Sequence, residues 1–124
     1  AGTDTPYFFG VDPSQLVKYA WFSRNAARKT HPVAEKLPSP NGLFDIYGNV
    51  LEWCRDYYDE NYYSGSPRRD PGGPSNGEGR VLRGGCWHRD SEHCRSAARA
   101  VNIGVERSSS FGFRIIVEIR ETLQ

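Results

Sequence analysis

A sixteen-residue stretch in the middle of the chain limits its fold more than any other feature. Residues 64–79 contain five glycines and three prolines, residue types that favour turns and interrupt helices and strands. This stretch is therefore expected to be a long irregular loop. The segments around it are short, and the clearest are predicted strands at 81–85 and 111–119. The pattern predicts a loop-rich α+β domain with short antiparallel strands and little regular secondary structure.

Charge and hydropathy argue against two classes of partner. The 124-residue chain carries 16 basic and 15 acidic residues, a balance that creates no broad attraction for nucleic acid or for a membrane surface. No apolar run approaches the roughly 20 residues of a membrane-spanning helix. We expect neither nucleic acid nor a membrane as a partner.

The first residues resemble the interior of a longer polypeptide. The sequence contains no methionine, and it opens in AGTDTPYFFG without a helix cap or a leading strand. The predicted strand at 111–119 also needs neighbours for its backbone groups. We therefore expect the chain to require a missing N-terminal part or a second copy of itself.

One turn carries oxygen ligands at close spacing. Asp45, Asn49 and Glu52 lie within eight residues, and Gly48 between them allows a sharp turn. Calcium prefers carboxylate, amide and backbone carbonyl oxygens, so this segment is a candidate calcium site, although its spacing is not that of an EF-hand. The alternative is that the side chains cap turns and that Glu52 pairs with an arginine.

Residues 80–99 concentrate softer ligands. Cys86, His88, His93 and Cys94 could together hold zinc or copper, but their spacing matches no standard zinc motif. In the alternative interpretation the histidines are exposed, Cys86 is packed in the interior, and Cys94 is buried or forms a disulfide with Cys54. Such a disulfide would indicate an exported or periplasmic protein.

Several arginines could form a binding face for a carboxylate or a peptide backbone. Such arginines are more often solvated or paired with acids such as Asp90 and Glu92. The arginines in question are at positions 83, 89, 95, 99 and 114.

Four ordered motifs carry a resemblance to a known family. They are NGLFDIYGNVLEW (41–53), RVLRGGCW (80–87), CRSAAR (94–99) and FGFR (111–114). Their order and spacing resemble those of the formylglycine-generating enzymes, also called sulfatase-modifying factors. The resemblance implies a fold related to C-type lectins, with residues 1–124 as the C-terminal portion of a single domain of that family.

The resemblance also implies a calcium site. The family's Gly-Asn-x-x-Glu-Trp turn binds calcium, and here it corresponds to residues 48–53. Carried over by position, the ligands would be the side chains of Asp45, Asn49 and Glu52, with the carbonyls of Gly48 and Val50.

The family's enzymes oxidise a substrate cysteine to formylglycine with oxygen and a copper(I) ion held by two cysteines. This chain departs from their pattern, because Arg89 stands at the offset of the first cysteine and Cys86 replaces the usual serine. Cys86 and Cys94 are the candidate catalytic residues if a copper-dependent oxidase activity is retained. A further alternative is an iron-dependent sulfur-oxidising enzyme completed by missing N-terminal sequence.

Because the standard cysteine pair is not matched, the favoured hypothesis is a non-canonical family member. It would bind a peptide or a small molecule on the surface formed by residues 86–110. The expected ligand-binding residues are Trp87, His88, Arg89, Arg99 and Arg114.

Overall fold

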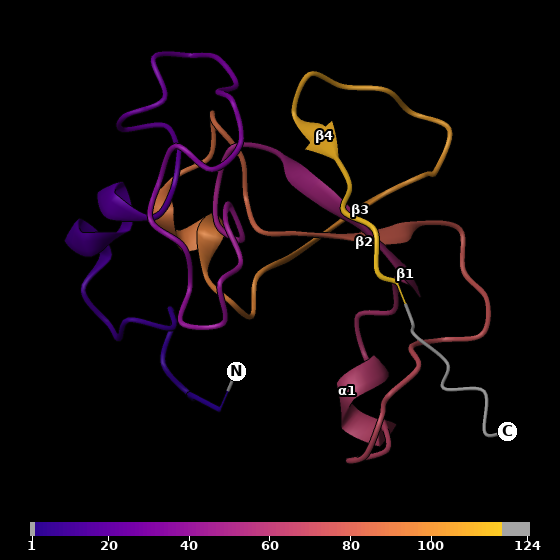
Figure 1. Cartoon of the computed structure of the whole chain (residues 1–124). Helices are drawn as coiled ribbons and strands as arrows, with labels where there is room; N and C mark the ends of the chain where they lie inside the picture. The colour runs from indigo at the N-terminus through magenta and orange to yellow at the C-terminus, as the bar shows by residue number, and fades with distance from the viewer. Residues whose placement is uncertain (1, 118–124) are drawn as a thin grey trace, which may run out of the picture.

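The computed structural model describes residues 2–117 and contains one small mixed sheet surrounded by long loops (Figure 1). The sheet order is β3-β2-β1-β4, with antiparallel β1–β2 and β2–β3 pairs and a parallel β1–β4 pair. The predicted loop-rich α+β class is therefore confirmed, with one parallel pair added. The elements are η1 (Pro13–Lys18), β1 (Leu51–Tyr57), α1 (Tyr62–Gly65), β2 (Arg80–Arg83), η2 (Ser91–Cys94), β3 (Arg99–Asn102) and β4 (Phe111–Gly112).

Helices are few and short in the described residues. The 3-10 helix η1 begins after Asp12, whose side chain accepts a hydrogen bond from the Ser14 amide, and Pro13 supplies a favourable first residue. The segment at 64–79, predicted to be a loop, contains only the end of α1. None of the helices in this part of the chain has the length and apolar character needed to cross a bilayer.

The predicted strand at 111–119 is shorter than expected. Only Phe111 and Gly112 pair with β1, and residues 113–117 lie outside the sheet. Beyond Gly112 the Arg114 side chain takes over from backbone pairing, because its guanidinium donates hydrogen bonds to the carbonyls of Phe44 and Asp45 and to the carboxylate of Glu52 on β1. Residues 118 and 119 of the prediction lie outside the described range.

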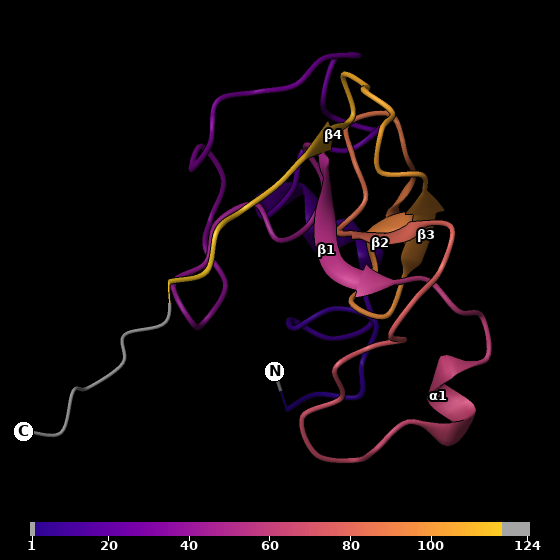
Figure 2. The same ribbon diagram turned by 90° about the vertical axis from the view of Figure 1, so that its right-hand side faces the viewer.

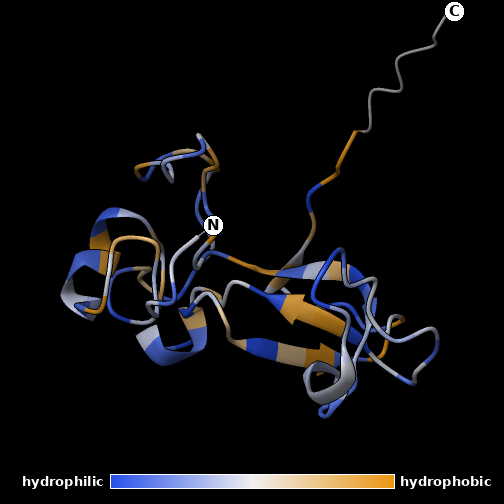
Figure 3. Ribbon diagram, turned by 90° about the horizontal axis from the view of Figure 1, so that it is seen from below, coloured by the Kyte–Doolittle hydropathy of each residue, from blue (hydrophilic) through white to orange (hydrophobic). Residues whose placement is uncertain are grey.

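Two clusters of buried side chains make up the core. The larger one joins the N-terminal loops through Tyr7, Leu16, Phe22, Tyr47 and Cys94 among others. Stacked and edge-to-face aromatic pairs, such as Tyr7 with Phe9 and Tyr7 with Tyr47, make up much of this cluster and its border. The smaller cluster lies on the sheet, where apolar residues follow the strands between polar loops (Figure 3).

Gly48 lies between the Trp21 segment and the Gly84 turn, at a point where a residue with a side chain does not fit. Its φ is +70°, and an added Cβ would lie 2.2 Å from the carbonyl oxygen of Trp21. We predict that Gly48→Ala lowers the free energy of unfolding by at least about 2 kcal/mol, through backbone strain and separation of the Trp21 segment.

Urea denaturation of the two proteins measures this loss. Gly104→Ala is the matched control, because a Cβ at Gly104 meets nothing within 4 Å and should change stability by less than about 0.5 kcal/mol. Equal stability of the two variants would contradict the prediction.

Candidate functional site

The turn predicted to bind calcium folds around a buried carboxylate. Asp45 is 8% exposed and adopts a positive φ of 54°. Its Oδ2 accepts a hydrogen bond of 2.8 Å from the amide of Ala34, whereas its Oδ1 is buried and has no partner in the described part of the chain. A buried carboxylate oxygen without a donor is costly, and a cation would relieve that cost.

Asn49 holds two loops together through its side chain. Its Oδ1 accepts a hydrogen bond from the amide of His31, and its Nδ2 donates one to the carbonyl of the same residue. This pairing mimics a strand ladder and fixes the loop around His31. It also uses the amide oxygen that the calcium prediction assigned to the ion.

Glu52 is already neutralised by an internal cation. Both of its carboxylate oxygens accept hydrogen bonds from the guanidinium of Arg114. This bonding raises the pKa of Arg114. The alternative in which Glu52 pairs with an arginine is therefore the arrangement observed.

The turn thus fits a metal ion only in part. A cavity of about 430 Å³ lies beside Asp45, Asn49, Val50 and Glu52, and Asp45 Oδ1 is available. Asn49 and Glu52 would have to share their oxygens with existing donors. Within residues 2–117, no group of three or more His, Cys, Asp or Glu side chains converges as a metal site. The calcium site stays a prediction.

The four predicted soft ligands do not gather around one point. Cys86 Sγ lies 3.4 Å from Nδ1 of His88, which also lies 3.1 Å from Oγ of Ser110. His93 instead pairs with Asp90 at 2.7 Å. Cys94 is fully buried in the larger core cluster. The arrangement connects a thiol, an imidazole and a hydroxyl without forming a four-ligand set.

The two candidate catalytic thiols are both withdrawn from solvent in this structure. Cys86 and Cys94 are both 0% exposed. Burial raises the pKa of the Cys94 thiol to about 12, so the thiol stays protonated at neutral pH, whereas the metal ligand and the nucleophile are both thiolates.

The predicted Cys54–Cys94 disulfide is not formed, because all three cysteines are free. Cys54 lies on β1 and is partly exposed, and it lines a cavity with Arg83 and Arg114. Cys94 lies in the larger core cluster, where its sulfur packs against the backbone of Gly85. The two residues belong to different parts of the fold, and the export argument that depended on their bond has no support.

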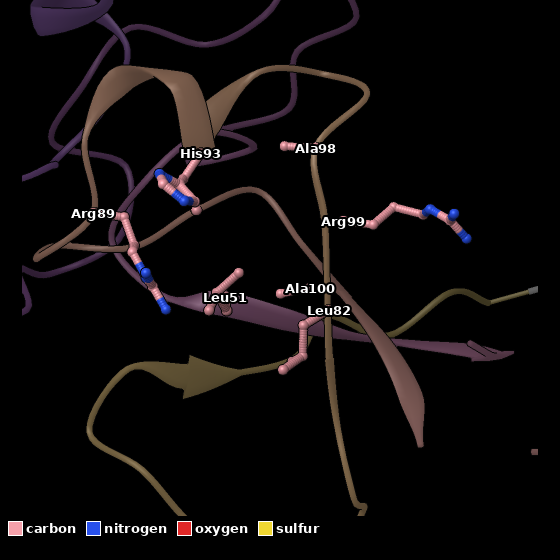
Figure 4. A pocket seen from close by; sticks show the side chains of 8 residues that line it. Leu51, Leu82, Arg89, His93, Ala98, Arg99 and Ala100 are labelled. Atoms are coloured by element: carbon pink, nitrogen blue, oxygen red, sulfur yellow. The ribbon is translucent and has the colours of Figure 1, made fainter. Parts of the chain in front are cut away.

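The surface of residues 86–110 contains a small apolar hollow of about 40 Å³. Figure 4 shows the Arg89 side chain extending toward Leu51, whereas the His93 ring lies above the two leucines and Arg99 points away from them. The Arg89 guanidinium forms no hydrogen bond or ion pair with any described residue. The full lining is Leu51, Leu82, Gly85, Arg89, His93, Ala98, Arg99 and Ala100.

The structure separates the five residues predicted to bind a ligand. Arg99 packs on Tyr58 and Tyr63, with its guanidinium carbon 4.8 and 4.7 Å from the two ring centroids. Arg114 is bound to Glu52 on another side of the sheet. The remaining two, Trp87 and His88, contact each other edge to face, and the Trp87 indole donates to the carbonyl of Ser109. Of these five residues, Arg89 is the one that borders the hollow with a charged group unpaired within residues 2–117.

The apolar floor of the hollow was not predicted. It depends on the register that places Leu82 opposite Ala100 and on the β1–β2 pairing that brings Leu51 beside them. The only sequence signal is the short apolar character of the strands, which does not reveal their register.

Comparison with known proteins identifies the class and then the family. The small mixed sheet and its long loops define an α+β domain of the same fold as Treponema denticola variable protein 1. A family model, described as sulfatase-modifying factor enzyme 1-like domain, matches residues 10–119. The chain belongs to this family, and the resemblance inferred from the four motifs is confirmed.

Curated relatives are much longer than this chain. A formylglycine-generating enzyme of Streptomyces coelicolor is 43% identical over 88 residues, which is 68% of this chain and 28% of that protein. A protein of Chlamydia pneumoniae named serine/threonine-protein kinase pkn1 is 44% identical over 87 residues, 68% of this chain and 14% of its own length. The chain therefore spans less than a third of these two relatives.

Solved structures extend the likeness to the whole fold. Treponema denticola variable protein 1 matches with a TM-score of 0.83 and 39% identity, over 90% of this chain and 40% of that one. PvdO from Pseudomonas aeruginosa matches with a TM-score of 0.75 and 25% identity, over 90% of this chain and 45% of that one.

The burial of Cys94 predicts a loss of stability in alkali. Its pKa rises from an ordinary value of 9.0 to about 12 on folding, mainly because of desolvation. Above pH 9 the unfolded chain releases a proton that the folded chain keeps. Stability is therefore complete below about pH 9 and falls toward pH 12, by about 1.4 kcal/mol per pH unit from this group.

Urea denaturation between pH 8 and pH 10.5 tests this expectation. Cys94→Ala is less stable at every pH because it leaves a cavity, but it should lack the part of the pH slope that belongs to the thiol. Identical slopes in the two proteins would show that Cys94 does not titrate in this way.

Proposed function

We propose that this domain is a non-canonical, ligand-binding member of its family. Its ligand is a peptide or small molecule that presents a short aliphatic group next to a carboxylate. The observation that carries the proposal is the apolar hollow on the 86–110 surface with the unpaired guanidinium of Arg89 beside it.

The hollow and the guanidinium suit two adjoining parts of one ligand. A cavity of about 40 Å³ exceeds the 10–15 Å³ that one water needs by a factor of about three, so it accepts a small aliphatic side chain. An apolar floor of Leu51, Leu82 and Ala100 favours such a group over water. Arg89 can bind a carboxylate with two parallel hydrogen bonds, and this fixes the ligand's orientation.

Family membership alone does not decide between binding and catalysis. The matched relatives include proteins named as formylglycine-generating enzyme and as serine/threonine-protein kinase. The second candidate is a copper-dependent oxidase, and the names of several relatives support it. The complete burial of Cys86 and Cys94 weighs against it. An iron-dependent sulfur-oxidising activity would require residues beyond this chain.

N-acetyl-leucine and its amide are probes for the proposed site. We expect the acid to bind more tightly than the amide by about three- to tenfold, because a charge-assisted hydrogen bond in this half-open position adds about 1 kcal/mol. Titration calorimetry or chemical-shift changes measure both affinities. Arg89→Gln should remove the preference for the acid.

Two further variants separate the parts of the site. Ala100→Leu fills the hollow and should weaken the acid and the amide alike. Arg68→Gln, in the exposed loop far along the sequence, is the matched control and should leave both affinities unchanged. Binding of the acid that survives both Arg89→Gln and Ala100→Leu would refute this site.

A calcium ion at the 45–52 turn is a separate proposal, supported by the buried Asp45 Oδ1 that has no partner among the described residues. Asp45, Asn49 and Glu52 would hold the ion, helped by the carbonyls of Gly48 and Val50. Because Arg114 already neutralises Glu52, we expect weak binding.

Thermal denaturation in chelator and in millimolar calcium tests this proposal. Calcium that binds only the folded state raises the melting temperature, and Asp45→Asn should abolish the rise. Glu106→Gln removes an exposed acid elsewhere and should leave the rise intact. An unchanged melting temperature in 10 mM calcium would rule the site out.

A further inference from the structure

The hollow beside Arg89 has a second polar side chain on its rim. Its floor comes from three neighbouring strands, with Leu51 on β1, Leu82 on β2 and Ala100 on β3 (Figure 2). His93 of η2 lines the same hollow, and its ring lies above the two leucines (Figure 4). Arg89 and the floor have roles in the proposed function, whereas His93 does not yet have one.

Asp90 fixes the place of the His93 ring. As the N-cap of η2, Asp90 accepts a hydrogen bond of 3.2 Å from the His93 amide through its Oδ1. The same oxygen lies 2.7 Å from Nδ1 of the ring. One carboxylate therefore holds both the backbone and the ring of His93, and the ring is positioned beside the hollow before any ligand binds.

The contact with Asp90 also decides which ring nitrogen is available. The hydrogen bond from His93 lowers the pKa of the Asp90 carboxyl, so the group is ionised at neutral pH and can only accept. Nδ1 therefore carries the ring proton, and in the neutral ring Nε2 is an acceptor. Among the hydrogen bonds of residues 2–117, this ring takes part only through Nδ1, so Nε2 is available to a ligand.

The backbone of Arg89 is held in place beside the same cap. Its amide donates to the carbonyl of Cys86 at 3.1 Å, and its carbonyl accepts from the Ser23 amide at 2.9 Å. Arg89 and His93 flank Asp90 and η2 on the rim of one apolar hollow. A group that binds carboxylates and a group that accepts from N–H thus adjoin a pocket for an aliphatic side chain.

We propose, building on the proposed function above, that the ligand is the free C-terminal residue of a peptide, with an aliphatic side chain. Its carboxylate binds Arg89, its side chain enters the hollow, and its backbone N–H donates to Nε2 of His93. In a C-terminal residue the carboxylate, the side chain and the N–H group are all attached to one carbon atom, so one site can bind all of them.

Other carboxylates lack this combination. The carbon next to the carboxylate of an aspartate or glutamate side chain bears neither an N–H group nor an aliphatic branch. A fatty acid or a hydroxy acid has no N–H group. Each of these ligands would leave Nε2 of His93 without a donor, and a polar group left unpaired on binding costs affinity.

Two acids that differ only at the N–H group test the contact with His93. In O-acetyl-leucic acid of the same configuration, an ester oxygen replaces the N–H of N-acetyl-leucine. We expect the ester to bind at least about threefold more weakly, because the hydrogen bond to Nε2 is lost. Titration calorimetry at pH 8, above the range in which histidine ordinarily ionises, measures both affinities.

His93→Phe keeps a ring above the hollow and removes the acceptor. In this variant the two acids should bind alike, while N-acetyl-leucine still binds more tightly than its amide through Arg89. The His93 side chain is 55% exposed, so the variant should fold, as circular dichroism can verify. Glu92→Gln is the matched control, because Glu92 precedes His93 in η2 but pairs with Arg95 and does not line the hollow. It should keep the difference between the two acids.

A longer probe tests the peptide class. The acetylated tripeptide Gly-Gly-Leu should bind at least as tightly as N-acetyl-leucine, and its C-terminal amide should bind about three- to tenfold more weakly. A tripeptide acid that binds more weakly than N-acetyl-leucine would contradict a peptide terminus as the ligand.

The outcomes separate this inference from the proposed function. Equal binding of the two acids by the unchanged chain, or a difference that persists in His93→Phe, would overturn the contact with His93. If N-acetyl-leucine still bound more tightly than its amide, the carboxylate site at Arg89 would stand. Loss of that preference in the unchanged chain would instead overturn the proposed function itself.

Discussion

The backbone reversal at Gly48 and Asn49 is the constraint on which the rest of the structure depends. The Gly48 amide donates to the carbonyl of Gly84, and the Asn49 amide donates to that of Trp21. The Asn49 carbonyl accepts from the amide of Trp87, and its side chain bonds the backbone of His31. Two residues with positive φ thus connect the long loop before β1 to the loop that follows β2, and both loops have almost no regular structure of their own. In a fold with so little secondary structure, such buried backbone bonds replace the missing ladders.

A second glycine turn, at Gly84 and Gly85, lies next to the buried cysteines. Gly84 and Gly85 bring the chain close to η2, where a Cβ at Gly85 would lie 2.4 Å from the sulfur of Cys94. The Cys94 thiol therefore packs in the core, and Cys86 is buried beside the sheet. Both thiols are 0% exposed and pack in this structure as small apolar groups.

The arginines differ in whether their guanidinium groups are already bonded within the protein. Arg114 cross-links the 44–45 turn to β1 through Glu52, and Arg99 lies between two tyrosine rings. Arg89 stands beside an apolar hollow with its charge unpaired among the described residues. The proposed ligand site rests on this contrast, because a guanidinium already bonded within the protein has little to offer a ligand.

The sequence by itself determined the loop-rich class, the sharp turn at Gly48 and the family. Glycine and proline restrict the backbone locally, and each of the four motifs is a short run of consecutive residues, so these features can be recognised without knowing the fold. It also predicted an oxygen-rich turn at 45–52 and an arginine face, but not their partners. Only the tertiary structure decided that Glu52 pairs with Arg114, that Cys54 and Cys94 lie apart, and that Leu51, Leu82 and Ala100 form one floor. These contacts join residues far apart in the chain, and they follow from strand register and loop closure. No local pattern encodes that register, because a shift of one residue would turn each side chain to the other face.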